Sequence, residues 1–288
     1  AVDQDFDQPS VYMNRAVAYL SLGNGRKAAE DFTRVIDKQP DNLFAYLQRG
    51  MAWQRERAWD EAIADFTKVL KIDPKHTQAL SSRGFTHYLK GDPARAVEDF
   101  TGVIELNPKS ALAYNNRGYN RQMIGQFKEA VADFDKAIEL APEFALSDQN
   151  KAWLLSTCPD DEIRDGKLAL KAAQTAGDLR EWKVISDVKS LAAAYAEVGD
   201  FKQATLWQKK AVDMAEGEAK STEEELLKLY EADAPFRFSP VSARGNYDGA
   251  WQTRVNLSHL RVGTESLYPR GAPALSRAIP VEDARRPA

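Results

Sequence analysis

The sequence repeats itself with a period of 34 residues. Alanine, phenylalanine and proline recur in one register along the first half of the chain. The recurring residues are Ala28, Ala62, Ala96 and Ala130; Phe32, Phe66, Phe100 and Phe134; and Pro40, Pro74, Pro108 and Pro142. Self-similarity at such a period is typical of stacked helix–turn–helix units. Because each unit packs only on its neighbours, we expect one continuous solenoid instead of separate globular domains.

The period divides residues 9–144 into four regular units. They align without gaps at 9–42, 43–76, 77–110 and 111–144. A small residue at the eighth position of each unit lets its first helix lie close to the second. Glycine ends the first helix in three units, where we expect a left-handed cap. Arg57 stands at this place in the second unit, so its turn is expected to differ.

This arrangement of small, aromatic and proline residues resembles the tetratricopeptide repeat family, and its bacterial members in particular. The resemblance continues more loosely over 145–218 as two divergent units, with about five extra residues in the turn at 158–166. It implies an all-α, right-handed α-α superhelix of about six helix pairs. Thr222 followed by three glutamates indicates the start of a C-terminal capping helix, assigned to 219–233. The proline-rich residues 234–288 are expected to form a mostly irregular or disordered tail.

Charged residues also follow the period. Arginine occupies position seven and aspartate position 23 of every regular unit: Arg15, Arg49, Arg83 and Arg117, with Asp31, Asp65, Asp99 and Asp133. Both are lost together in the fifth and sixth units, as a direct contact between them would require. The arginines are interpreted either as a ladder that grips acidic ligands or as a structural ladder of salt bridges. The need of a half-buried arginine for a fixed carboxylate favours the structural ladder.

The resemblance implies that the first helices of the units form a concave, peptide-binding face. At position six, amide side chains suit a peptide backbone because they donate and accept hydrogen bonds, and the alternative is a merely solvated polar position. Surplus aromatic and methionine side chains beside it indicate a partner site. The predicted peptide-binding residues are Asn14, Gln48, Met51, Phe85, Tyr88, Asn115, Asn116, Tyr119, Gln122, Met123 and Asn150.

Residues typical of catalysis are few and scattered. His76, His87 and His259 are far apart, and the single cysteine, Cys158, precedes a proline in a predicted turn. The sequence has neither a glycine-rich phosphate loop nor metal-ligand spacing. We therefore expect no enzyme activity, no cofactor and no metal.

The expected function is that of a protein–protein interaction scaffold or adaptor, which receives an extended peptide or a helix of another protein. The formal net charge of the chain is −4. Eight positively charged arginines lie in residues 232–288, so the repeats alone are more acidic than the whole chain. An acidic body argues against a nucleic-acid partner. No apolar run is long enough for a membrane span.

Several alternatives stay open from the sequence. The array is alternatively the recognition module of a larger enzyme or secretion assembly whose catalytic part lies outside this chain, or a self-associating scaffold. Phe236, Phe238 and the arginines of the tail either fold back onto the acidic body and occupy the groove or belong to a flexible tail. The start at Ala1, without methionine, is expected of a mature secreted chain or of a piece of a longer protein, and the compartment stays undetermined.

Overall fold

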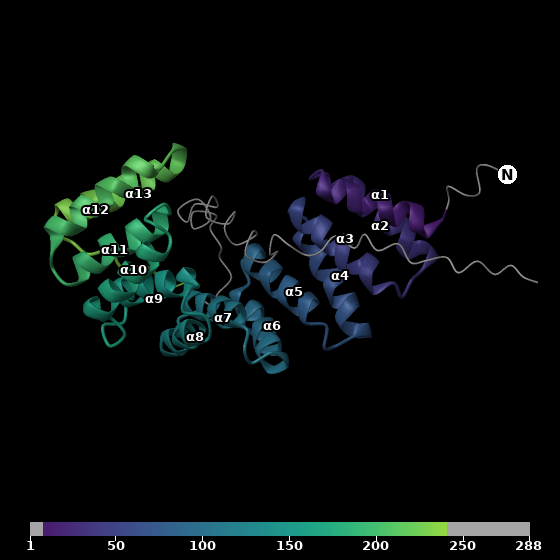
Figure 1. Ribbon diagram of the computed structural model, residues 1–288, viewed down its shortest axis with the longest axis horizontal. Helices are drawn as coiled ribbons and strands as arrows, with labels where there is room; N and C mark the ends of the chain where they lie inside the picture. The colour runs from purple at the N-terminus through teal and green to yellow at the C-terminus, as the bar shows by residue number, and fades with distance from the viewer. Residues whose placement is uncertain (1–7, 241–288) are drawn as a thin grey trace, which may run out of the picture. The chain divides into compact units, whose positions relative to one another are not determined.

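The computed structural model describes residues 8–240, and every regular element in that range is an α-helix (Figure 1). The helices are α1 Pro9–Ser21, α2 Gly25–Lys38, α3 Leu43–Arg55, α4 Trp59–Ile72, α5 Thr77–Lys90, α6 Pro93–Leu106, α7 Ala111–Met123, α8 Phe127–Leu140, α9 Ala145–Thr157, α10 Gly166–Leu179, α11 Ile185–Glu197, α12 Phe201–Met214 and α13 Gly217–Glu231. The predicted all-α helical-repeat solenoid is confirmed. Within the described range, no helix is long and apolar enough to cross a bilayer.

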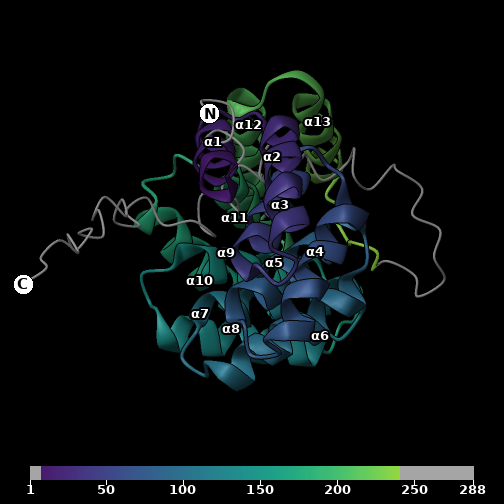
Figure 2. The ribbon, with the colours of Figure 1, turned by 90° about the vertical axis from the view of Figure 1, so that its right-hand side faces the viewer.

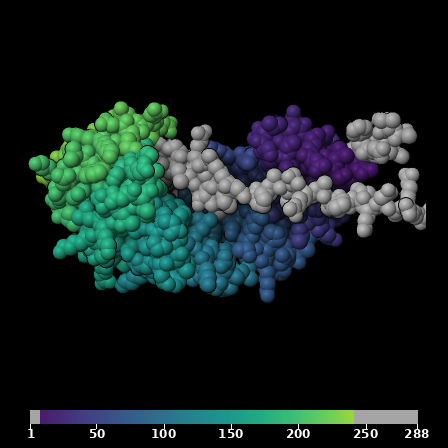
Figure 3. Space-filling view, viewed as in Figure 1, coloured from purple at the N-terminus to yellow at the C-terminus, as the bar shows by residue number. Residues whose placement is uncertain are grey.

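Successive helices pack on one another in chain order, and the first eight fall two to each 34-residue unit. Figure 3 shows the chain running from the purple N-terminal residues through teal to the green C-terminal ones, and α12 and α13 lie side by side in Figure 2. Direct contacts also join α3 to α5, α7 to α9 and α9 to α11, whereas no two even-numbered described helices come comparably close. We call the surface of the odd-numbered helices the inner face.

The core of each regular unit is a phenylalanine from the second helix held against a small residue of the first. Phe32, Phe66, Phe100 and Phe134 are all fully buried. A Cβ atom added to Gly50 would lie 2.7 Å from Cε1 of Phe66, so only glycine permits this approach. Burial of each ring contributes roughly 2–3 kcal/mol, which explains why the same pair recurs with the period.

The turn of the second unit is the same as in its neighbours, so the expected difference at Arg57 is wrong. Arg57 adopts a φ of 59°, in the left-handed region that Gly23 and Gly125 occupy with φ of 78° and 81°. Its amide donates to the carbonyl of Gln54 at 3.1 Å, as the amide of Gly23 donates to its own helix end. We infer that the packing of α3 on α4 requires this turn, so the backbone of Arg57 adopts a left-handed conformation that is strained for a residue with a side chain.

Arg57→Gly is therefore expected to raise the free energy of unfolding by about 1 kcal/mol, because glycine adopts this conformation without a Cβ clash. Gly125→Ala is the reciprocal control: its added Cβ meets nothing within 4 Å, so backbone strain alone should cost about 1 kcal/mol. Urea unfolding followed by circular dichroism measures both changes. A loss of stability in Arg57→Gly would contradict this account of the turn.

The divergent C-terminal units show one expected and one unexpected boundary. The extra residues of the fifth unit lie in the loop 158–165 between α9 and α10, as expected. The last helix, α13, begins at Gly217, so the prediction that Thr222 opens it is wrong. Glu223 is instead buried inside the helix, where Nε2 of Gln208 donates to its carboxylate at 2.8 Å. This acidic residue joins the cap to α12 and has no role at a helix N-terminus.

The chain after α13 is irregular but packed over residues 234–240. Phe238 is only 4% exposed, and its amide donates to the carbonyl of Thr157 at 3.0 Å. Residues 241–288 of the predicted tail, with His259, lie outside the described residues.

Candidate functional site

The recurring arginines and aspartates contact one another within each regular unit. The distance from Nη2 of the arginine to Oδ1 of the aspartate 16 residues later is 2.6–2.7 Å in all four units. A second donor, Nε, contacts the same carboxylate. The aspartates are buried, so the paired guanidinium compensates the loss of their hydration.

The same arginines also reach the preceding unit, a contact that the sequence analysis missed. Nη1 donates to a threonine hydroxyl of the preceding second helix over distances of 2.9–3.3 Å: Arg49 to Thr33, Arg83 to Thr67 and Arg117 to Thr101. These threonines recur with the 34-residue period, which is the signal that could have revealed them. With their donors directed at these protein acceptors, the arginines are better suited to a structural ladder than to gripping acidic ligands.

The fifth unit keeps this link between units by exchanging both partners. Lys151 replaces the arginine, and Asp135 stands where the threonine recurs. Nζ of Lys151 lies 2.5 Å from Oδ1 of Asp135. The sequence suggested that Lys151 has no acidic partner. In the structure its partner is Asp135 of the preceding unit, which takes the place of an aspartate in the same unit.

If the ladder is structural, Asp99→Ala will lower the free energy of unfolding by roughly 2–4 kcal/mol, because the largely buried Arg83 loses its carboxylate. Asp60→Ala is the matched control. It removes an exposed carboxylate 2.5 Å from Lys90, and is expected to cost less than about 1 kcal/mol. Chemical denaturation compares the two variants. Equal losses would contradict a structural role of the ladder.

An aromatic cluster lies on the inner face between the third and fourth units. Phe85 and Tyr88 of α5 have ring centroids 6.0 Å apart, and Tyr88 meets Tyr119 of α7 edge to face at 5.5 Å. All three residues are partly exposed. Desolvation raises the pKa of the Tyr119 hydroxyl, and its hydrogen bond with Tyr88 opposes that rise. The cluster is therefore an apolar surface that also carries the hydroxyl groups of Tyr88 and Tyr119.

This cluster belongs to a longer row of apolar residues at the ninth position of successive units. We call it the position-nine row: Val17, Met51, Phe85, Tyr119 and Trp153. Each member is at least partly exposed to solvent. Phe44 lies two turns before Met51 on α3 and is 45% exposed. Trp153 is not among the predicted contact residues, because those apolar positions end with the fourth unit, and the 34-residue period is the signal that extends the row to it.

The remaining predicted peptide-binding residues, the amides and Met123, differ in their exposure to solvent. Asn14 is exposed, and Gln48, Asn116 and Met123 are partly exposed. Three other predicted contact residues, Asn115, Gln122 and Asn150, are buried. Nδ2 of Asn150 donates to Oδ1 of Asn115 at 3.0 Å, so these amides join α9 to α7. They lie between helices because close approach of the odd-numbered helices covers them, and a peptide on the surface would not reach them.

The residues considered for catalysis have structural surroundings. Nδ1 of His76 accepts from the amide of Ala79 at 3.2 Å and caps α5. His87 is buried, which lowers its pKa. Burial likewise raises the pKa of the Cys158 thiol, so the reactive thiolate is disfavoured. Over residues 8–240, no cluster of three or more His, Cys, Asp or Glu side chains could hold a metal ion.

Comparisons with known proteins agree with this architecture. Two models of the tetratricopeptide repeat match residues 13–77 and 111–144. No curated protein matches the chain significantly. The predicted resemblance to tetratricopeptide repeats is confirmed.

Three solved structures illustrate the similarity of fold. PilW, a widely conserved type IV pilus biogenesis factor, is 18% identical with a TM-score of 0.60, over 70% of this chain and 91% of its own. YrrB, a TPR protein with an unusual peptide-binding site, is 19% identical with a TM-score of 0.52, over 62% and 90%. MamA is 20% identical with a TM-score of 0.53, over 58% and 95%. At these identities the likeness concerns the fold.

Proposed function

We propose that this chain, an array of tetratricopeptide repeats, is a protein-interaction scaffold or adaptor whose inner face binds an extended segment of another protein. The observation that carries the proposal is the position-nine row, which leaves Met51, Phe85 and Tyr119 partly exposed on consecutive units. Apolar side chains aligned on rigid helices and left open to solvent are typical of a partner site. Gln48 and Asn116 lie on the same helices and supply amide groups for a peptide backbone.

The extended form of the ligand is supported by the chain itself. Residues 234–240, which form no helix, contact Trp153, the last member of the same row. YrrB, which shares the fold, is described as having a peptide-binding site. A non-catalytic role agrees with the buried Cys158 and His87. These observations favour binding over catalysis as the activity of the array.

The proposal is tested with peptides selected on the full chain from a displayed random library. For a selected peptide, the double variant Met51→Ala/Phe85→Ala is expected to raise the Kd by about tenfold or more, because truncated apolar anchors dominate such interfaces. Fluorescence anisotropy with labelled peptide measures the Kd.

Leu206→Ala is the matched control, since Leu206 is 60% exposed but lies on α12, an even-numbered helix. It should leave the Kd unchanged. Equal binding by all variants would refute the proposed surface. Light scattering across concentrations tests for self-association. If the wild-type chain forms a dimer and the Met51→Ala/Phe85→Ala variant is a monomer, the ligand of this surface is a second copy of the chain.

A further inference from the structure

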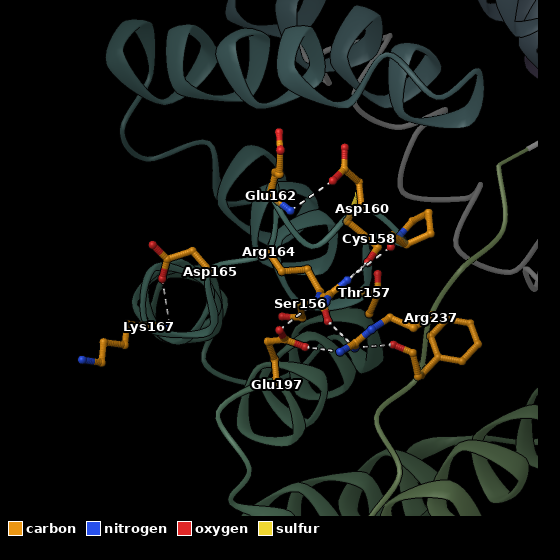
Figure 4. Close-up of polar contacts among 12 residues, drawn as sticks. Ser156, Thr157, Cys158, Asp160, Glu162, Arg164, Asp165, Lys167, Glu197 and Arg237 are labelled. Carbon is orange, nitrogen blue, oxygen red and sulfur yellow. Dashed lines mark hydrogen bonds and ion pairs between the residues drawn. The ribbon is translucent and has the colours of Figure 1, made fainter.

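The irregular residues 234–240, here called the C-terminal segment, return from α13 along the array. They contact α11 and α9, where Arg237 lies beside Glu197 and Ser156 (Figure 4), and also the start of α8. Phe236 and Phe238 pack on the helices, and Arg237 between them also contacts the array, whereas Pro235 and Ser239 on either side are exposed. Three consecutive side chains of an irregular segment therefore lie against the helices, as those of a bound peptide do on a binding surface.

The segment completes the C-terminal end of α9. The last four carbonyls of a helix have no partner within it. Here Leu154 and Leu155 accept from the backbone amides of Cys158 and Asp165, at 3.0 and 3.1 Å. The next two carbonyls depend on the segment: Ser156 accepts from Nη1 of Arg237 at 3.1 Å, and Thr157 from the amide of Phe238 at 3.0 Å. The helix end thus presents two acceptors to an extended chain.

A carboxylate fixes the arginine at the centre of the segment. Oε2 of Glu197, the last residue of α11, lies 2.6 Å from Nη2 of Arg237. The other oxygen of Glu197 lies 3.0 Å from Nε of Arg164, in the extra loop of the fifth unit. Arg237 therefore lies at the ends of α9 and α11, where the helix dipoles favour a cation. The loop inserted in the fifth unit positions the carboxylate that receives it.

Aromatic contacts hold the residues on either side of the arginine. Phe236 stacks on Trp153 with ring centroids 5.7 Å apart and packs against the cluster that contains Ala192 and Tyr230. Phe238 meets Phe127 edge to face, also at 5.7 Å. Each phenylalanine therefore lies on an apolar contact surface contributed by a different unit.

We infer that the fourth to sixth units carry a second peptide-binding site, selective for an extended aromatic–arginine–aromatic segment, which Phe236, Arg237 and Phe238 occupy. Two apolar surfaces at alternate positions select the aromatic residues, and Glu197 with the carbonyl of Ser156 selects arginine over lysine or a neutral residue. A segment of this kind from another protein competes with the chain's own. The site shares Trp153 with the position-nine row but includes neither Met51 nor Phe85, so variants at those two residues test the first surface independently.

The test uses the full chain and a fluorescent peptide with the sequence of residues 234–240. Arg237→Glu places a second negative charge beside Glu197 and should release the chain's own segment. This variant is expected to bind the free peptide about tenfold or more tightly than the wild-type chain does, because its site is no longer occupied. Phe236→Ala/Phe238→Ala, which weakens the aromatic contacts instead, should show the same gain.

Two controls test the recognition chemistry. Adding Glu197→Gln to Arg237→Glu should abolish the gain, and a peptide carrying glutamate in place of its arginine should bind no variant. Circular dichroism verifies that each variant is folded. Folded variants that bind the peptide no better than wild type, or that bind both peptides equally, would overturn the inference. Loss of the native helical signal in both released variants would also overturn it, because the segment would then be an integral part of the fold.

Discussion

An arginine–aspartate ion pair recurs in all four regular units, and in three of them the arginine also contacts the preceding unit. In each regular unit an arginine at position seven neutralises a buried aspartate of its own second helix, as Arg83 does with Asp99. The same guanidinium donates to the preceding unit, through Thr67 in this case. Because a buried charge is tolerated only when its partners are in place, the pair constrains both the hairpin and its neighbour. One arginine therefore contacts both the second helix of its own unit and that of the preceding unit.

The register between units explains why the inner face carries a continuous apolar row. Because the units share one register, the ninth position falls at the same place on the first helix of every unit. Phe85, Tyr119 and Trp153 are thus brought into line although they are 34 residues apart in sequence. The units use this row differently: the third and fourth leave it partly open, whereas Phe236 contacts Trp153 in the fifth.

The divergence of the fifth unit and the place of the C-terminal segment are physically connected. The loop 158–165 supplies Arg164, which pairs with Glu197, and Glu197 in turn contacts Arg237. Regular units have short turns and no such extra loop. A departure from the repeat, which in the sequence looks like decay of the pattern, is the feature that builds a polar site at the ends of α9 and α11.

The sequence by itself determined the repeat, because alanine, glycine and phenylalanine at fixed positions allow only one close packing of two helices. It also pointed to the pairing of Arg83 with Asp99, since both recur and disappear together. Tertiary structure decided what local propensity could not. Arg57 takes a glycine conformation because two packed helices require it, and Asn115 and Asn150 are buried because neighbouring helices approach closely. The contacts of Arg237 depend on helix ends that lie far apart in the chain, so only the folded array brings them together.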